Sequence, residues 1–243
     1  MKIKAPDTVT FTKSGFCPGC GHGLAVRLIA EVMEEMGLSD KLLTVVDVAC
    51  GSLNIESWKF DTVLAAHGRP LPVAVGIQKV RKDNPVVAYI GDGAAYSIGM
   101  AETMHCALRN DNILTIVINN SLYGMTGGQC APTSLPGQVT TSTPHGKDPK
   151  KAGMPFKVED AFGGFESIAY LARGSMTDAA NMNKSKKMLR KAFDKHMAGQ
   201  GFCLVELLSP CPTNLGLPPL ANIDWIADEM MKYFPLGEFR GGA

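Results

Sequence analysis

The stretch that decides the fold covers residues 86–120 and reads VVAYIGDGAAYSIGMAETMHCALRNDNILTIVINN. It begins with an apolar run over residues 86–90, of the kind found in a strand buried on both faces. Gly91-Asp92-Gly93 then makes a tight turn, and residues 94–109 are predicted to form a helix. A second apolar run follows at residues 113–118. This order predicts two parallel strands joined by a helix that covers the sheet.

The same alternation continues on both sides of this stretch. We predict strands over residues 42–49, 167–171 and 202–208, and helices over residues 24–36, 73–82 and 178–197. Helices alternating with apolar strands are typical of the α/β class with a doubly wound, mostly parallel sheet. Residues 121–155 are rich in turn formers and longer than an ordinary connection, which indicates a functional loop. We expect one domain over residues 1–243, with a Cys-x-x-Cys segment near its start and a C-terminal extension.

The composition excludes several classes of protein. The 243 residues include 24 Lys and Arg, 23 Asp and Glu and 45% apolar residues, so the chain can bury a core and is not disordered. A net charge of +1 supplies no uniform field for nucleic acid. Residues 1–13 contain no apolar export segment, and the longest aliphatic run is too short to span a bilayer. We therefore expect a cytoplasmic protein that binds neither nucleic acid nor membranes.

Polar residues follow the two strands of the opening stretch where each strand ends. Gly91 and Gly93 let the backbone approach a ligand closely, and the N–H groups of the following helix favour a phosphate. Asp92 and Asn120 end neighbouring strands and converge on one point, where carboxylate, amide and carbonyl oxygens suit Mg²⁺. Taken singly, Asp92 is explained as a helix cap and Asn119-Asn120 as a turn. Together they favour a magnesium and phosphate site.

Seven cysteines without an export signal indicate metal binding, redox chemistry or core packing rather than disulfides. Cys17 and Cys20 form a Cys-x-x-Cys pair, which is ambiguous among zinc, iron–sulfur and thiol redox chemistry. Cys50 and Cys211 each follow a predicted strand, so both should lie near the edge that holds Asp92. The other three cysteines are given no metal role: Cys106 and Cys203, expected to be buried core thiols, and Cys130.

The segment from Gly91-Asp92-Gly93 to Asn119-Asn120 resembles the thiamine diphosphate (TPP) motif. The following sequence, YGMTGGQ at residues 123–129, narrows the resemblance to the β subunit of the 2-oxoacid:ferredoxin oxidoreductases. The resemblance extends from Cys17 to about Gly216 and implies the TPP-binding fold of the diphosphate domain. It also implies that this domain binds TPP, Mg²⁺ and one [4Fe-4S] cluster.

The resemblance carries ligand roles onto particular residues. Asp92, Asn120 and the carbonyl of Leu122 would bind Mg²⁺. The cluster ligands would be Cys17, Cys20, Cys50 and Cys211. Four thiolates suit a structural zinc ion equally well, so that alternative stays open. What favours iron–sulfur is the TPP site, whose chemistry uses a nearby electron acceptor.

Other residues resemble family segments that lie against TPP. The expected cofactor-binding residues are Val48, Ala49, Cys50, Gly51, His67, Gly91, Asp92, Gly93, Ala94, Gly124, Met125 and Thr126. His67 is also our candidate catalytic residue, because an imidazole changes charge near neutral pH. A lone histidine is also common as a structural residue.

The resemblance implies TPP-dependent oxidative decarboxylation of a 2-oxoacid to acyl-coenzyme A and CO₂, with electrons passed through the cluster to ferredoxin. TPP supplies the organic chemistry and the protein supplies position and electrostatics. The chain has no room for the pyrimidine domain, so we expect a partner α subunit to carry it. We also expect γ and ferredoxin-like δ subunits in the complex.

The substrate class rests on one position. Some relatives carry a Lys where this chain has Gly127, and the missing cation favours a branched-chain 2-oxoacid of the 2-oxoisovalerate type. The same chemistry on 2-oxoglutarate or pyruvate is the alternative. Two further alternatives are a TPP decarboxylase or synthase half without a cluster, and a zinc-stabilised, non-catalytic α/β module.

Overall fold

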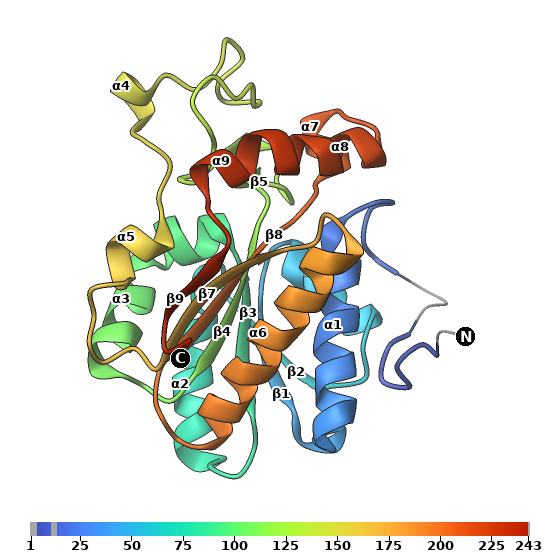
Figure 1. Ribbon diagram of the computed structural model, residues 1–243, viewed down its shortest axis with the longest axis vertical. Coiled ribbons are helices and arrows are strands. Elements are labelled where there is room, and N and C mark those ends of the chain that lie inside the picture. Colours follow the sequence, from blue (N-terminus) through green and yellow to red (C-terminus); the bar gives the residue numbers. More distant parts are fainter. Residues whose placement is uncertain (1–3, 11–13, 243) are drawn as a thin grey trace.

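The computed structural model describes residues 4–10 and 14–242, which contain one large β-sheet (Figure 1). Its strands are β1 Leu43–Asp47, β2 Asp61–Ala65, β3 Val86–Gly91, β4 Leu114–Asn119, β7 Tyr170–Ser175, β8 Cys203–Leu208 and β9 Gly237–Arg240. They lie in the order β2-β1-β3-β4-β8-β7-β9, and every neighbouring pair is parallel except β7 and β9. A small ladder pairs β5 Leu122–Tyr123 with β6 Gln129–Cys130. The predicted doubly wound, mostly parallel α/β class is confirmed.

Helices cover both faces of the sheet. The α-helices are α1 Gly21–Met36, α2 Pro70–Val80, α3 Met100–Arg109, α4 Pro149–Ala152, α5 Val158–Phe162, α6 Ala179–Met197, α7 Pro212–Leu215, α8 Pro219–Trp225 and α9 Met231–Tyr233. Shorter helical turns are η1 Ser39–Lys41, η2 Cys50–Glu56, η3 Ala94–Ile98 and η4 Ile226–Met230. In Figure 1, α1 and α6 lie side by side on one face, and α2 and α3 on the other. No helix within the described residues is long and apolar enough to cross a bilayer.

The central strands are buried on both faces, as their continuous apolar sequences predict. Successive side chains of β3 point to opposite faces, so they enter two separate cores. Val87 and Tyr89 pack with the α1 and α6 side, whereas Val86, Ala88 and Ile90 pack with the α2 and α3 side. The strand therefore joins two cores and holds its carboxyl end in a fixed position.

The helix predicted over residues 24–36 is confirmed together with its end before Gly37, but it begins earlier than predicted, at Gly21. Gly37 has the left-handed φ of 65°, and its N–H donates to the carbonyl of Glu34, which closes the last turn. The helix predicted over residues 178–197 is confirmed to within one residue as α6. Asp178 caps it by accepting a hydrogen bond from the N–H of Asn181.

The parallel register brings the carboxyl ends of the strands to one edge of the sheet. Gly91 at the end of β3 pairs with Ile118, and Asn119 at the end of β4 pairs with Leu208 of β8. The segments that follow β1, β2, β3, β4 and β8 therefore start from the same edge. This is the edge at which doubly wound sheets bind ligands.

The prediction of one continuous helix over residues 94–109 is wrong. The structure has the π-helical turn η3, then a break at Gly99, and only then α3. The break brings Gly99 against the loop after β2, where a Cβ at position 99 would lie 2.4 Å from the carbonyl oxygen of Gly68. Only a glycine permits this approach, and the contact ties the loop of His67 to the helix that follows Asp92.

Three further predicted boundaries are wrong. The strand expected at residues 167–171 is displaced to Tyr170–Ser175, because the charged Arg173 lies fully buried within it and breaks the apolar pattern. The strand expected at 42–49 stops at Asp47, and the N–H of the next residue, Val48, donates a hydrogen bond to the carbonyl of Ala65. The helix expected near 73–82 begins earlier, at Pro70, a residue suited to the first helical turn.

Several elements were not predicted from the sequence. The edge strands β2 and β9 are short, and the half-exposed pattern of β2 gives no continuous apolar run. The C-terminal extension forms α7, α8, η4 and α9, which Figure 1 shows above the carboxyl ends of the strands. Ile226, Met230 and Phe234 of this layer pack with Leu208 at the end of β8. The extension therefore covers part of the ligand-binding edge.

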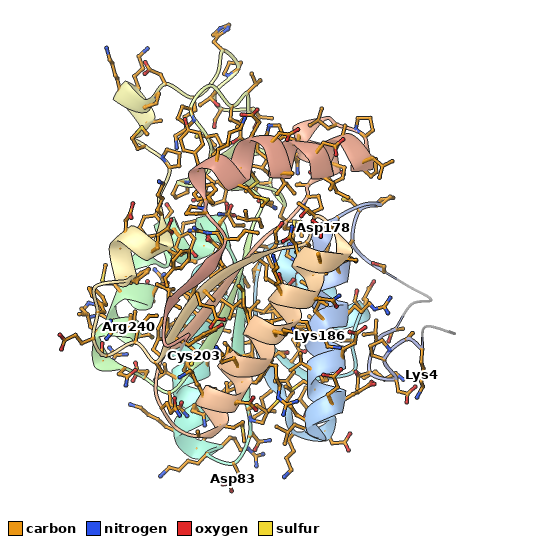
Figure 2. All side chains as sticks on the ribbon, viewed as in Figure 1. Lys4, Asp83, Asp178, Lys186, Cys203 and Arg240 are labelled. Carbon is orange, nitrogen blue, oxygen red and sulfur yellow. The ribbon has the colours of Figure 1, made fainter. Side chains whose placement is uncertain are left out.

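Two cysteines occupy the core as predicted. Cys203 of β8 is fully buried beneath α6, where Figure 2 labels it, and Cys106 of α3 is buried on the opposite face. Lys186 of α6, labelled in Figure 2, forms ion pairs with Glu31 and Glu35 of the neighbouring α1. The single-domain organisation over residues 1–243 stays a prediction.

Candidate functional site

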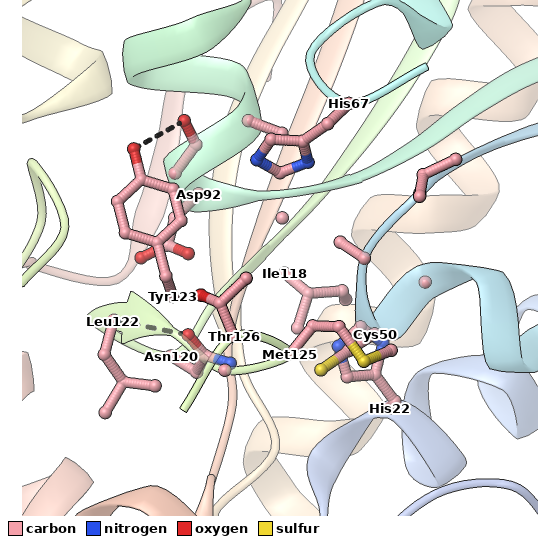
Figure 3. A pocket seen from close by; sticks show the side chains of 17 residues that line it. His22, Cys50, His67, Asp92, Ile118, Asn120, Leu122, Tyr123, Met125 and Thr126 are labelled. Carbon is pink, nitrogen blue, oxygen red and sulfur yellow. Dashed lines mark hydrogen bonds between the residues drawn. The ribbon is translucent and has the colours of Figure 1, made fainter. Parts of the chain in front are cut away.

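A pocket opens at the carboxyl edge of the sheet (Figure 3). Every residue that the sequence analysis assigned to the cofactor, from Val48 to Thr126, lines it, and so do Asn120 and Leu122. His22, Ile118 and Tyr123 also line it, although the sequence did not single them out. The fold thus brings together segments that follow four different strands.

Asp92 is the buried carboxylate of this pocket. Asp92 is 2% exposed, and the hydroxyl of Thr133 donates a hydrogen bond to its carboxylate. Burial raises the pKa of the Asp92 carboxyl to about 7, and the hydrogen bonds from Thr133 and the backbone oppose that rise. No lysine or arginine of the described residues lines the pocket, so a divalent cation would supply the missing positive charge. The donor set therefore fits Mg²⁺ with a diphosphate.

The turn after β4 presents the other two predicted magnesium ligands. The side-chain carbonyl of Asn120 accepts a hydrogen bond from the N–H of Leu122 at 3.3 Å. Ser121 between them has a left-handed φ of 61°, which is unusual for a residue with a side chain. Its carbonyl accepts hydrogen bonds from the side chains of Ser134 and Gln138. Residues of the long loop thus hold the turn in this conformation.

A buried polar network supports the same turn from within the sheet. The Asn119 amide donates to the Glu206 carboxylate at 3.0 Å, and its carbonyl accepts from the N–H of Ser121. Glu206 is paired in turn with Arg173, which also pairs with Glu159 of α5. Sequence reasoning missed this network, although charged residues inside two apolar strands were a visible signal. Such charges are stable when buried only with partners.

The Gly91-Asp92-Gly93 turn leaves no space for a side chain at its last residue. A Cβ on Gly93 would lie 2.2 Å from the ring of Tyr123, whose hydroxyl donates to the Gly93 carbonyl at 3.3 Å (Figure 3). The glycine therefore lets two loops, one from each of two neighbouring strands, close on one pocket. Tyr123 gives no motif signal of its own beyond its place in the YGMTGGQ segment.

His67 faces the pocket and is backed by a carboxylate that the sequence analysis did not assign. Its Nδ1 lies 2.7 Å from Oδ2 of Asp47, although the two are not aligned as in a linear hydrogen bond. Asp47 is fully buried, and its Oδ1 accepts from the N–H of Gly68 at 2.8 Å. The His67 side chain keeps 31% of its surface exposed. The arrangement leaves the Nε2 atom of His67 as the nitrogen available to a ligand.

The four predicted cluster cysteines line a second cavity of about 310 Å³. It adjoins the first, and the residues that line both are His22, Cys50, Asn120, Gly124 and Met125. Cys130 lines neither cavity. The thiols therefore surround a space that shares a wall with the pocket of Asp92.

The thiols of this second cavity are spread apart. Among the described residues, no three His, Cys, Asp or Glu side chains lie close enough to share one metal ion. A single zinc ion would require the thiols to move together, whereas a four-iron cluster is ligated at four separate irons. Burial raises the pKa of Cys20 to about 12 and that of Cys50 to about 11, so metal binding would release protons. The arrangement fits a cluster better than a single ion.

His22 lies where the two cavities meet. It is buried, and its Nδ1 lies 2.7 Å from the hydroxyl of Tyr89. Burial lowers the pKa of His22 to about 4, so the imidazole is neutral at pH 7. Phe16 stacks on the ring, with centroids 5.1 Å apart. The sequence analysis did not single out His22, although this histidine forms part of the wall that the two cavities share.

Comparison with known proteins gives the family. Residues 43–207 match the family described as thiamine pyrophosphate enzyme, C-terminal TPP binding domain. The ketoisovalerate oxidoreductase subunit VorA of Methanothermobacter thermautotrophicus is 36% identical over 98% of this chain and 52% of its own length. The 2-oxoglutarate synthase subunit KorB of Archaeoglobus fulgidus is 32% identical over 84% of this chain and 72% of its own length. This chain thus spans about half the length of the VorA relatives.

A solved structure agrees with these relatives. The 2-oxoglutarate:ferredoxin oxidoreductase from Magnetococcus marinus, determined with 2-oxoglutarate, coenzyme A and succinyl-CoA bound, superposes with a TM-score of 0.77. It is 28% identical, and the match covers 94% of this chain and 74% of that one. With the pocket of Asp92 and the cavity of the four cysteines at one sheet edge, the chain belongs to the TPP-binding domain family and, within it, to the β subunits of the 2-oxoacid:ferredoxin oxidoreductases.

Proposed function

We propose that this chain is the TPP-binding β subunit of a complex that oxidatively decarboxylates a 2-oxoacid to acyl-coenzyme A and CO₂ and passes the electrons to ferredoxin. The observation that carries the proposal is the wall shared by two cavities, one around Asp92 and the other around the four cysteines. A cofactor that gives up electrons in the first cavity would lie next to an acceptor in the second. The domain that binds both is residues 1–243.

The first cavity would hold TPP through Mg²⁺. Asp92, the amide oxygen of Asn120 and the carbonyl of Leu122 are proposed as the magnesium ligands, supported by their common place at the pocket. TPP, when bound, supplies the carbanion chemistry that removes CO₂ from a 2-oxoacid. The chain would bind and orient TPP through Gly93, the loop that contains Gly124 and the other residues that line the pocket. We propose that His67, through its free Nε2, holds or moves a proton at the reacting end.

The second cavity would hold one [4Fe-4S] cluster on Cys17, Cys20, Cys50 and Cys211. The common place of the four thiols around one cavity, with no three of the described metal-binding side chains close enough to share a single ion, supports this assignment. The cluster, when bound, accepts electrons one at a time and passes them on. The neutral, buried His22 and the apolar Phe16 that stacks on it both line this cavity and would limit the access of water to the cluster. Exclusion of water is one of the factors that set a cluster's potential.

We propose branched-chain 2-oxoacids of the 2-oxoisovalerate type as the first substrate class and 2-oxoglutarate as the second. No lysine or arginine of the described residues lines either cavity, so these linings offer no cation to a second carboxylate. Gly127, with its φ of 106°, contributes only backbone. The relatives named for ketoisovalerate are 35–36% identical, against 32–33% for those named for 2-oxoglutarate. Pyruvate stays an alternative substrate of the same chemistry.

Partner subunits would complete the site. We propose an α subunit that carries the pyrimidine domain, with γ and ferredoxin-like δ subunits. Val48 and Met125 line the pocket yet leave 51% and 48% of their surfaces exposed. Apolar side chains of this kind beside a pocket are suited to cover by another chain.

The proposal is tested on the complex purified without oxygen together with its co-expressed partner chains. Iron and acid-labile sulfide are measured, and acceptor reduction is assayed with coenzyme A and 2-oxoisovalerate, 2-oxoglutarate or pyruvate. We expect four irons per β chain, bound at the cysteines, in addition to the iron that the δ subunit holds, and fastest reduction with 2-oxoisovalerate. A complex that binds zinc but no TPP, or that decarboxylates without reducing any acceptor, would overturn the proposal in favour of one of its rivals.

A further inference from the structure

Asn214 lines the second cavity beside the shared wall and belongs to neither the predicted ligands nor the predicted cofactor contacts. It is part of α7, the short helix that follows Cys211 and lines the second cavity. Its side-chain amide donates to the carbonyl of Gly124 at 2.8 Å and approaches the sulfur of Cys211 at 3.6 Å. One NH₂ group thus reaches a residue of the shared wall and a proposed cluster ligand.

The first of these bonds fixes which way the amide faces. An asparagine amide has two N–H donors on one side and a carbonyl acceptor on the other. The Gly124 carbonyl can only accept, so the NH₂ group must point toward it, and the second N–H is then left for Cys211 Sγ. The opposite orientation would set two carbonyl oxygens against each other.

The loop of residues 123–129 is packed against this side chain. A Cβ on Gly128 would lie 3.1 Å from the Cβ of Asn214, and Gly128 itself has a left-handed φ of 82°. A Cβ on Gly124 would lie 3.3 Å from the sulfur of Cys50 and 3.7 Å from the Asn214 amide nitrogen. The close approach of two glycines keeps the amide in place between the loop and the sulfur.

The position of Cys211 is held separately. Its backbone N–H donates to the side-chain carbonyl of the buried Asn222 at 3.1 Å. Asn222 therefore fixes the backbone of Cys211, while Asn214 acts on its sulfur. Loss of the Asn214 amide would remove a hydrogen bond to sulfur and leave the anchor of the ligand's backbone intact.

We propose that Asn214 is a positioning residue that donates an N–H hydrogen bond to the Cys211 thiolate and thereby raises the reduction potential of the cluster. The inference rests on the proposed function, because it requires a [4Fe-4S] cluster at the four cysteines. Reduction adds negative charge that is shared by the ligand sulfurs. A donor aimed at one of those sulfurs stabilises the reduced state more than the oxidised state.

The test compares the cluster potential in variant complexes purified without oxygen. Asn214→Leu removes both donors at similar volume, and Asn214→Asp keeps the shape while replacing the donors with a carboxylate. Asn112→Leu is the matched control, because Asn112 is also half-buried and its amide also donates to a backbone carbonyl, that of His196. It lines neither cavity. The midpoint potential is measured by a dithionite titration followed by electron paramagnetic resonance.

We expect both Asn214 variants to have a more negative midpoint potential than the unsubstituted complex, with Asn214→Asp shifted further because it adds negative charge. The Asn112→Leu potential should stay unchanged. If the Asn214→Leu complex fails to assemble a cluster, Asn214→Ala provides the comparison, because it removes both donors and adds no charge. A cluster whose potential is unmoved in the Asn214 variants would overturn this inference alone. An unsubstituted complex that has no [4Fe-4S] signal, or whose [4Fe-4S] signal all belongs to the δ subunit, would overturn the cluster assignment and this inference with it.

Discussion

Asp92 combines complete burial with a pocket that has no cationic side chain among the described residues. We expect Asp92→Asn to weaken TPP binding in the presence of Mg²⁺ by at least about 100-fold, because loss of even an outer partner of a metal ligand costs roughly 10- to 100-fold. Calorimetric titration of the complex with TPP at saturating Mg²⁺ measures this. The exposed Asp83 provides the control, Asp83→Asn, which should bind normally. Unchanged affinity in Asp92→Asn would show that the carboxylate does not hold the cation.

His67 and Asp47 should act together at the proposed site. We expect His67→Ala to lower kcat by about 100-fold or more, as for loss of a general acid or base. Asp47→Asn should lower kcat less, by about 10-fold, because it releases the ring without removing it. TPP affinity should fall far less than kcat in either variant, because the diphosphate and Mg²⁺ contacts stay in place.

Steady-state acceptor reduction separates these effects, with His105→Ala as the control. His105 is exposed on α3 and lines neither cavity. Equal activity of His67→Ala and His105→Ala would rule out a role for His67 in turnover.

The sequence predicted those site residues that belong to short motifs beside strand ends. Gly91, Asp92, Asn120 and Cys50 directly follow apolar runs, so parallel strands alone bring them to one edge. Residues that act across the fold gave no such signal. Thr133 reaches Asp92 over 41 positions of the chain, and Asn214 reaches Gly124 over 90. Such contacts depend on how loops fold back, which local sequence does not specify.

At the scale of elements, α6 lies unusually close to β7. A Cβ on Gly174 would lie 2.2 Å from the hydroxyl oxygen of Ser185 and 3.2 Å from its Cα. We expect Gly174→Ala to lower the free energy of unfolding by about 1–3 kcal/mol through overpacking. Urea denaturation followed by circular dichroism measures this.

Gly164→Ala is the matched control, because a Cβ at that exposed position would have no atom within 4 Å. It should change the free energy of unfolding by less than about 0.5 kcal/mol. If the two variants are equally stable, the helix must be free to move away from the strand, and the close contact is then not a constraint.

The elements that the sequence predicted well are those with uniform burial. Local rules of capping predict the C-terminus of α1 at Gly37 and the N-terminus of α6 at Asp178. Apolar runs predict the strands at the centre of the sheet. The failures involve tertiary contacts. Gly99 breaks a helix because it meets Gly68, and Arg173 enters a strand because Glu206 and Glu159 neutralise it.

At the scale of the whole molecule, the chain spans about half the length of its VorA relatives. We expect the isolated chain to reduce no acceptor with any 2-oxoacid, and activity to appear when the α partner is added. A titration of the chain with its partner, followed by the rate of acceptor reduction, measures this. Full activity of the chain alone would show that the partner contributes nothing to the site.

The wall shared by the two cavities limits how this protein can be redesigned. Cys50, Gly124 and Met125 face both spaces, so a substitution chosen to admit a bulkier acyl group also changes the surroundings of the sulfurs. Under the proposed function, specificity and electron flow would therefore not be independent traits at these positions. A combinatorial library for new substrates should keep all three fixed. It can vary Tyr123 and Thr126, which line only the pocket of Asp92.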